Sequence, residues 1–237
     1  MTINYHIVIN TTPYHVTIYI FKELSMSYPV KSVPELSLLY RPNHESFVQA
    51  WWGHRGFAQR LARALRPNTF AELGVHAGDS YFAFVEAFDV FEIECNSYAV
   101  DLWEGDEHSG VYDNSIYDSV QNVNSKYSSK SNLLKMTFEQ AADIVLNIDL
   151  LHIDGLHTYD AVKNDYETWN NKVNDMIIFH DINVPWNPEF GVWKLWDEIK
   201  ENSSFQCYEF MHCFGLAVLC KSAKAVNAME SIISTLA

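Results

Sequence analysis

Short apolar segments alternate with longer amphipathic segments along most of the chain. From about Glu45 onward the longer segments have helical periodicity, and Phe57, Leu61 and Leu65 recur at positions i, i+4 and i+8. The short segments predict strands at residues 69–73, 98–101, 133–136, 148–153, 176–179, 205–210 and 216–220. Such alternation predicts parallel βαβ units with helices on both faces of one sheet.

The end of the chain departs from this alternation. Only residues 211–215 separate the last two predicted strands, so these strands are expected to form an antiparallel hairpin. We therefore predict an α/β fold with a doubly wound, mostly parallel seven-stranded sheet that ends in a C-terminal antiparallel hairpin. A helix over residues 47–65, which Pro67 ends, is expected before the first strand.

The N-terminal segment has a different pattern. Residues 2–21 alternate and are rich in Ile, Val, Thr and Tyr, with Thr11, Thr12 and Pro13 in the middle, which is typical of a strand pair. Residues 32–44 contain two prolines and are expected to be a connector. We therefore divide the chain into a strand-rich extension, residues 1–45, and a main domain, residues 46–237.

The composition narrows the classes of function. The chain has 237 residues, of which 48% are hydrophobic and 14% aromatic, so it can bury a sizeable core and is not a disordered chain. A formal net charge of −14 repels phosphate backbones and argues against nucleic acid as a partner. Four cysteines without paired spacing, no signal peptide and no long apolar stretch favour a cytoplasmic protein that makes no use of a membrane.

A glycine-containing loop follows the first predicted strand of the main domain. Glu72, Gly74 and Gly78 belong to the run ELGVHAGDS, in which Ser80 or the preceding Asp79 is placed to cap the next helix. The spacing is GxxxG rather than the GxGxxG of dinucleotide sites. A carboxylate beside the loop disfavours a pyrophosphate and suits a cationic amino-acid group, although an ordinary turn between strand and helix would also fit.

An acid at the end of the next predicted strand supports a ligand. Asp101 lies 27 residues after Gly74, close to the ~20 residues expected before an acid that holds a ribose. A carboxylate there can accept both ribose hydroxyls, or can cap the next segment. The loop and this acid together indicate a cofactor that contains a nucleoside.

Four longer segments resemble a known family. They are ELGVHAGDSY from Glu72, AVDLWEGDEHSG from Ala99, LLHIDGLHTYDAVKNDYETW from Leu150 and IIFHDINVPWNPEFGVWKLW from Ile177. Between about Phe47 and Cys220 the chain resembles class I S-adenosylmethionine (SAM) dependent methyltransferases of the methyltransferase 24 type. Members often look like sugar or glycoconjugate O-methyltransferases that occur near glycosyltransferases or are fused to them.

The resemblance implies a SAM site and a small-molecule or sugar acceptor. The residues around the glycine loop, Glu72, Gly74 and Gly78, would line the methionine group, and Asp101 would hold the ribose. The residues expected near the adenine are Leu102, Trp103, Thr137 and Phe138. The implied cofactor-binding residues are Glu72, Gly74, Gly78, Ser80, Asp101, Leu102, Trp103, Thr137 and Phe138.

The resemblance and the residues also indicate a reaction centre. Asp154 and His157 follow one predicted strand, and His180 and Asp181 follow the next, so all four can meet at the carboxyl edge of the sheet. With Asp154 beside it, His157 or His180 is expected to take the acceptor proton. Asp154, Asp181 and His180 are also the candidate metal ligands, with Mg²⁺ as the metal. However, His180 stands where metal-using relatives often have an acid, and so does Leu156, which leaves a metal-free site open.

Other polar residues have simpler interpretations. Val162, Tyr166 and Trp169 fall on one face of a predicted core helix, and Asp160 and Asp165 are expected to be solvated on it. The acidic run after the ribose strand is either a solvated patch or the rim of the site; it consists of Glu104, Asp106, Glu107 and His108.

Two further functions remain open from the residues. A metal-dependent hydrolase would use the same four centre residues but would leave Glu72 and Asp101 without a role. A noncatalytic SAM-binding module would bind the cofactor without turnover. Residues 1–45 are expected to close over the acceptor or to pair with a second copy of the chain in a homodimer, because unpaired strand edges recruit partners.

Overall fold

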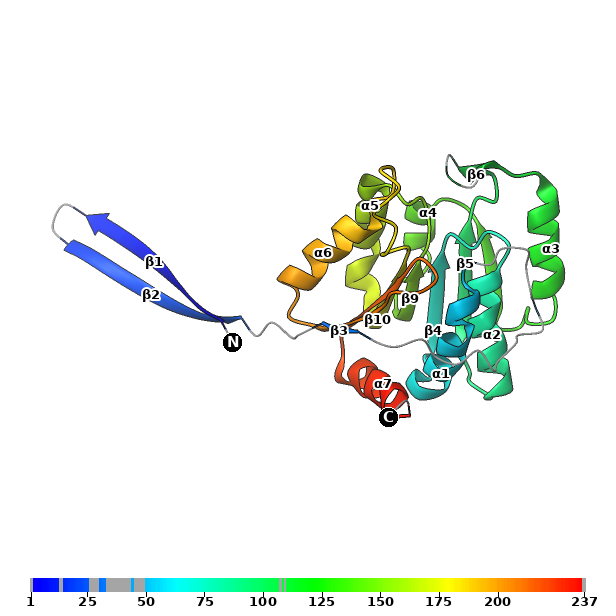
Figure 1. Cartoon of the computed structure of the whole chain (residues 1–237), viewed down its shortest axis with the longest axis horizontal. Coiled ribbons are helices and arrows are strands. Elements are labelled where there is room, and N and C mark those ends of the chain that lie inside the picture. The colour runs from blue at the N-terminus through cyan, green and yellow to red at the C-terminus, as the bar shows by residue number, and fades with distance from the viewer. Residues whose placement is uncertain are drawn as a thin grey trace.

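The structure is a computed structural model that describes residues 2–12, 15–25, 30–32, 44, 50–106, 108 and 110–235. Its main feature is an eight-stranded sheet in the order β3-β11-β12-β10-β9-β4-β5-β8 (Figure 1). The strands are β3 (Lys31–Ser32), β4 (Thr69–Leu73), β5 (Asn96–Asp101), β8 (Ser131–Lys135), β9 (Ile148–Ile153), β10 (Val173–His180), β11 (Gln206–Phe210) and β12 (Leu216–Cys220). The seven predicted strands are confirmed, with boundaries that shift by at most three residues.

The directions of the strands follow the predicted pattern. The pairs β5 with β8, β4 with β5, β4 with β9 and β10 with β9 are parallel, whereas β12 pairs antiparallel with β10 and with β11. The predicted fold class, with its C-terminal antiparallel hairpin, is therefore confirmed. The sequence pattern missed β3, which has two residues and pairs with the edge strand β11.

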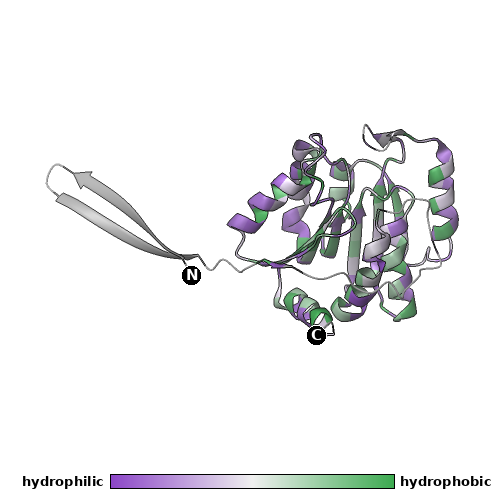
Figure 2. Cartoon of the chain, in the orientation of Figure 1, coloured by the Kyte–Doolittle hydropathy of each residue, from purple (hydrophilic) through white to green (hydrophobic). Residues whose placement is uncertain are grey.

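Helices cover both faces of the sheet. The helices are α1 (Arg55–Leu65), α2 (Asp79–Val90), α3 (Asn114–Asn124), α4 (Phe138–Ala142), α5 (Tyr159–Trp169), α6 (Val192–Asn202) and α7 (Ala223–Ile233). Helices α1, α2, α3 and α7 contribute to one apolar cluster, and α4, α5 and α6 to the other. Neighbouring strand residues such as Phe70 and Ala71 belong to opposite clusters, because side chains alternate across a sheet. Figure 2 shows the hydrophobic residues concentrated in the central strands.

Two helices differ from the prediction. The helix expected over residues 47–65 begins at Arg55, after a 3₁₀ turn at Trp52–His54; residues 45–49 lie outside the described residues. A Cβ on Gly53 would lie 2.3 Å from Cys213 Sγ, so this turn packs tightly on the loop between β11 and β12. Helix α7, which the apolar pattern did not reveal, is capped by Ser222 and buries Met229 and Ile232.

The N-terminal strand pair is confirmed. Strands β1 (Thr2–Thr12) and β2 (His15–Ser25) pair antiparallel from Thr2 with Ser25 to Thr12 with His15. Two short strands, β6 (Gly105–Asp106) and β7 (Gly110–Val111), form a further small hairpin after β5. None of the helices in the described ranges has the length and apolar content to span a bilayer.

Candidate active site

A cavity of about 470 Å³ opens at the carboxyl ends of β4, β5, β8, β9 and β10. Ligands of open α/β sheets bind at this edge, and the volume is in the range of roughly 300–1,000 Å³ that small-molecule sites have. Of the residues that the sequence predicted, those lining the cavity are Gly74, Ser80, Asp101, Leu102, Thr137, Phe138, Asp154, His157, His180 and Asp181. Glu72, Gly78 and Trp103 do not line it.

The loop after β4 requires its glycines for two different reasons. Gly74 has φ +84°, and a Cβ on it would lie 2.2 Å from the carbonyl oxygen of Asp154, so only glycine allows the loops after β4 and β9 to touch. Gly78 has φ +82° and precedes α2 as its N-cap, and a Cβ on it would meet the ring of Phe82. Gly78 therefore shapes the turn behind the cavity, and the expected capping by Asp79 or Ser80 is wrong.

Glu72 corrects the sequence prediction most clearly. Its side chain is fully buried inside the sheet, where its carboxylate accepts hydrogen bonds from Ser80 Oγ at 2.7 Å and from His152 Nδ1 at 2.9 Å. Burial raises the pKa of this carboxyl, although His152 and Ser80 oppose the shift. Because Glu72 is part of β4 rather than of the loop after it, it supports Ser80 from beneath instead of touching a ligand.

Asp101 holds the glycine loop in place. Its Oδ2 accepts hydrogen bonds from the backbone N–H groups of Val75 and His76, both at 2.8 Å, and its Oδ1 accepts one from the N–H of Trp103 at 2.6 Å. A carboxylate offers about four acceptor sites, and Oδ1 accepts only one of these three bonds, so Asp101 can still accept a hydrogen bond from a hydroxyl group in the cavity that it lines.

The residues expected around an adenine separate into two groups. Leu102 is 41% exposed and lines the cavity, whereas Trp103 is buried and donates from Nε1 to the carbonyl oxygen of His76. On the opposite side Thr137 caps α4, which places Phe138 against the cavity. Trp103 was therefore predicted wrongly as a ligand contact, since its indole packs beneath the loop.

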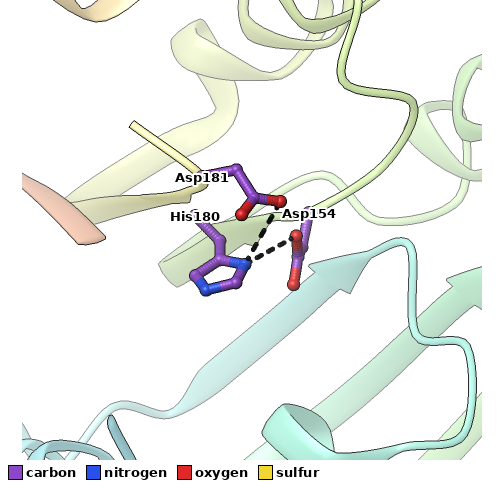
Figure 3. Close-up of side chains that lie close together, drawn as sticks. All are labelled: Asp154, His180 and Asp181. Atoms are coloured by element: carbon purple, nitrogen blue, oxygen red, sulfur yellow. Dashed lines mark hydrogen bonds and ion pairs between the residues drawn. The ribbon is translucent and has the colours of Figure 1, made fainter. Parts of the chain in front are cut away.

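The four centre residues do converge. Asp154 and His157 follow β9, and His180 and Asp181 lie at the end of the adjacent strand β10; Figure 3 shows Asp154, His180 and Asp181 pointing toward one another. His157 Nε2 lies 2.8 Å from Asp181 Oδ2 and 3.7 Å from Asp154 Oδ1. His180 Nδ1 lies 3.2 Å from Asp154 Oδ1 and 3.5 Å from Asp181 Oδ2.

The charges of the centre balance one another. Burial alone would lower the pKa of His157, but its hydrogen bonds to Asp154 and Asp181 outweigh burial and raise that pKa to about 9. The same two carboxylates raise the pKa of the buried His180. Burial alone would raise the pKa values of Asp154 and Asp181. The two histidines outweigh burial, so both pKa values lie below the ordinary range of an aspartate.

The two histidines differ in their surroundings. The ring of His180 is almost fully buried, and its Nε2 donates to the carbonyl oxygen of Cys213 at 3.1 Å. The ring of His157 lies at the rim, where it stacks on Phe190 with centroids 4.5 Å apart and approaches His108. His157 is thus the histidine of the pair with more contact with solvent.

Several residues around the centre were not predicted from the sequence. Trp51 lines the cavity, and the ring of the buried His54 lies 5.7 Å from that of His180. Arg55 forms an ion pair with Asp79, which ties α1 to the start of α2. The residues lie in the run AWWGHRGF, whose clustered aromatic and polar side chains were the available clue.

The acidic run after β5 fits both of its interpretations in part, since Glu104 is exposed and does not line the cavity whereas Asp106 does. Asp106 lines the cavity, and the ring of His108 lies beside the rings of His157 and Phe190; Glu107 lies outside the described residues. The expectation that Asp165 is solvated is wrong. Asp165 is buried in α5, and burial together with the nearby Glu139 raises its pKa to about 7.

The centre fits a divalent cation. Among the described residues Asp154, His180 and Asp181 can each offer one ligand atom, all within 4.8 Å of one another. Two carboxylate oxygens and one imidazole nitrogen form a donor set that proteins use for such ions.

The methyltransferase 24 family model, a methyltransferase domain, matches residues 71–182. The match begins within β4 and includes the glycine loop, Asp101 and the centre as far as Asp181. Residues 71–182 therefore match a methyltransferase domain of this family. The predicted family agrees with the model over the matched residues, and the hydrolase alternative loses its support.

Relatives and solved structures agree with this domain. The chain is 39% identical over 182 residues to the uncharacterized protein y4gI of Sinorhizobium fredii, a match that covers 75% of this chain and spans only about a fifth, 20%, of that protein's length. Three solved structures share the fold of the methyltransferase domain at low identity. TomG, an O-methyltransferase of Streptomyces achromogenes in complex with SAM, has a TM-score of 0.55 and 10% identity, over 75% of this chain and 90% of that chain. The S-adenosylhomocysteine-bound methyltransferase PaMTH1 of Podospora anserina has a TM-score of 0.54 and 13% identity, over 70% of this chain and 77% of that chain. An O-methyltransferase of Bacillus cereus in complex with S-adenosylhomocysteine has a TM-score of 0.53 and 12% identity, over 76% of this chain and 84% of that chain.

Proposed function

We propose that the methyltransferase domain transfers the methyl group of SAM to a hydroxyl group of a small-molecule or carbohydrate acceptor. The observation that carries this proposal is the convergence of His157, Asp154, His180 and Asp181 in the wall of the cavity. SAM would lie with its methionine group near Gly74 and Ser80, its ribose at Asp101, and its adenine between Leu102 and Phe138.

A second hollow beside the cavity supports an acceptor site. Asp181 and Ala50 line both hollows, so a molecule bound in the second one can reach the centre. Trp186 is 65% exposed and Phe214 is 45% exposed, and both line this hollow. Flat, exposed aromatic faces suit the apolar face of a sugar or another ring, while the hydroxyl groups of that ring point toward Asp181.

The geometry suggests how the transfer proceeds. The acceptor oxygen forms a bond to the methyl carbon as the bond from that carbon to sulfur breaks, and the electron pair of the broken bond stays on sulfur in S-adenosylhomocysteine. The hydroxyl proton passes to the neutral form of His157, and Asp181 and Asp154 stabilise the protonated ring that results. Because these carboxylates raise the pKa of His157 to about 9, transfer through this ring should become faster as the pH rises toward 9. His180, with both nitrogens in hydrogen bonds, orients the two carboxylates. A divalent cation held by Asp154, His180 and Asp181 would lower the pKa of the acceptor hydroxyl.

Methyl transfer can be tested with SAM that carries an isotopically labelled methyl group. Incubation of the full chain with sugars and phenols should give a product heavier by the labelled methyl, detected by mass spectrometry. His157→Asn should lower turnover by about 10²–10⁴-fold and leave S-adenosylhomocysteine affinity unchanged, because the ring acts on the acceptor proton.

His212→Asn is the matched control, since His212 contacts the carbonyl oxygen of Gly53 and does not line the cavity. If the His157→Asn enzyme transfers methyl groups as fast as the wild type, His157 does not move the proton. If SAM binds but no acceptor is methylated, the domain is a binding module.

A further inference from the structure

One ligand atom in the centre differs in kind from the other two. Asp154 and Asp181 offer carboxylate oxygens, whereas His180 offers an imidazole nitrogen. We propose that this site selects a first-row transition-metal ion such as Mn²⁺ or Co²⁺ over Mg²⁺, with Nδ1 of His180 as the ligand that sets the preference. The proposal rests on the proposed function only in placing the metal beside the acceptor.

The donor chemistry favours the softer ions. Mg²⁺ prefers an octahedron of oxygen ligands and keeps several of its waters. Imidazole nitrogen binds Co²⁺, Fe²⁺ and Zn²⁺ much better than it binds Mg²⁺, and Mn²⁺ accepts both oxygen and nitrogen. Compared with a site of three oxygen donors, a site of two carboxylate oxygens and His180 Nδ1 therefore has a higher affinity for transition metals relative to Mg²⁺.

The structure holds this nitrogen in a ligating orientation. His180 Nε2 donates to the carbonyl oxygen of Cys213, which leaves Nδ1 directed at Asp154 and Asp181. A hydrogen bond from the second ring nitrogen to a carbonyl oxygen is the usual support of a metal-bound histidine. The rings of His54 and Trp51, with centroids 5.7 and 6.3 Å from that of His180, pack around the imidazole and limit its rotation.

His157 has a different role although it is also near the carboxylates. Its ring packs against Phe190 and His108 at the rim, and it does not belong to the three-residue group whose ligand atoms lie within 4.8 Å of one another. The centre thus has one histidine for the metal and another for the proton. This division predicts that variants of the two histidines will have different effects on metal binding.

The test measures metal affinity of the full chain, saturated with S-adenosylhomocysteine, by calorimetric titration with Mg²⁺, Mn²⁺ and Co²⁺. The wild type should bind Co²⁺ and Mn²⁺ more tightly than Mg²⁺. In His180→Asn, which keeps an oxygen donor, the ratio of Co²⁺ to Mg²⁺ affinity should fall by about 10-fold or more, because even the loss of a second-shell partner of a metal ligand costs about 10–100-fold in affinity. His212→Asn and His157→Asn should leave the ratio near that of the wild type.

A spectroscopic readout is independent of these affinities. Pulsed electron paramagnetic resonance of bound Mn²⁺ should show coupling to an imidazole nitrogen in the wild type and in His157→Asn. The proposal is overturned if that coupling is absent from the wild type, if Mg²⁺ binds as tightly as Co²⁺, or if none of the three ions binds. If any of these outcomes is found and methyl transfer persists, the metal proposal is wrong and the proposed function stands. If S-adenosylhomocysteine does not bind, the proposed function is wrong instead. If His180→Asn does not fold, the nitrogen coupling and the metal affinities of the wild type still test the proposal.

Discussion

At the scale of single residues, two acidic side chains that the sequence pattern placed at a ligand or in solvent are buried inside the domain. Glu72 and Asp165 were predicted to meet a ligand and solvent respectively, and both are buried. The helical periodicity of α5 placed Val162 and Trp169 in the core correctly. It could not show that Asp165 packs beside Gly155 in the loop after β9, because that packing also involves Phe138 from a distant segment.

The buried Asp165 predicts an unusual dependence of stability on pH. Its folded-state pKa of about 7 is above its unfolded value near 4, so the unfolded chain releases this proton first and stability falls as pH rises from about 4 to 7. Asp165→Asn removes this loss. It should raise the free energy of unfolding by up to about 4 kcal/mol at pH 8 and change it little near pH 4.

Urea denaturation at both pH values checks this prediction. Asp160→Asn, an exposed position on the same helix, is the control and should have little effect at either pH. An Asp165→Asn effect of equal size at pH 4 and pH 8 would show that Asp165 ionises normally in the fold.

At the scale of elements, the sequence predicted the strands well because each is a short apolar run bounded by polar residues. It predicted the cavity because the residues after β4, β5, β9 and β10 meet at one edge of a parallel sheet. It missed β3, whose pairing with β11 has no local pattern, and it could not show that Asp101 holds the loop after β4 by its backbone.

The hydrogen bonds of Asp101 predict a double effect of its replacement. Asp101→Ala should weaken S-adenosylhomocysteine binding by about 1–3 kcal/mol, because the N–H groups of Val75, His76 and Trp103 lose their acceptor and the loop loses its shape. The melting temperature of the ligand-free chain should also fall. Glu104→Ala, an exposed acid in the loop that follows β5, is the control. Unchanged affinity and melting temperature would remove Asp101 from both roles.

At the scale of the whole molecule, residues 1–45 are not one uniform segment. Lys31 and Ser32 form β3 within the main sheet, and Lys31 also contacts Glu230 of α7, whereas residues 2–12 and 15–25 form the separate strand pair of β1 and β2. We propose that this strand pair joins the chain to a second copy, because a two-stranded sheet leaves the outer edges of both strands for pairing.

Two truncations separate these parts. Removal of residues 1–29 should leave the melting temperature and S-adenosylhomocysteine affinity of the domain unchanged but shift the mass measured by light scattering from dimer to monomer. Removal of residues 1–40 should in addition lower the melting temperature, because β11 loses its neighbour β3. A full-length chain that is already monomeric at micromolar concentration would refute pairing through β1 and β2.

The central claim is that the cavity at the carboxyl edge of the sheet holds SAM. Calorimetric titration of the full chain with S-adenosylhomocysteine tests it most directly. We expect saturable binding of one ligand per chain and a melting temperature that rises with ligand concentration, because a ligand that binds only the folded state stabilises it. No heat of binding and no rise in melting temperature at millimolar S-adenosylhomocysteine would contradict the claim.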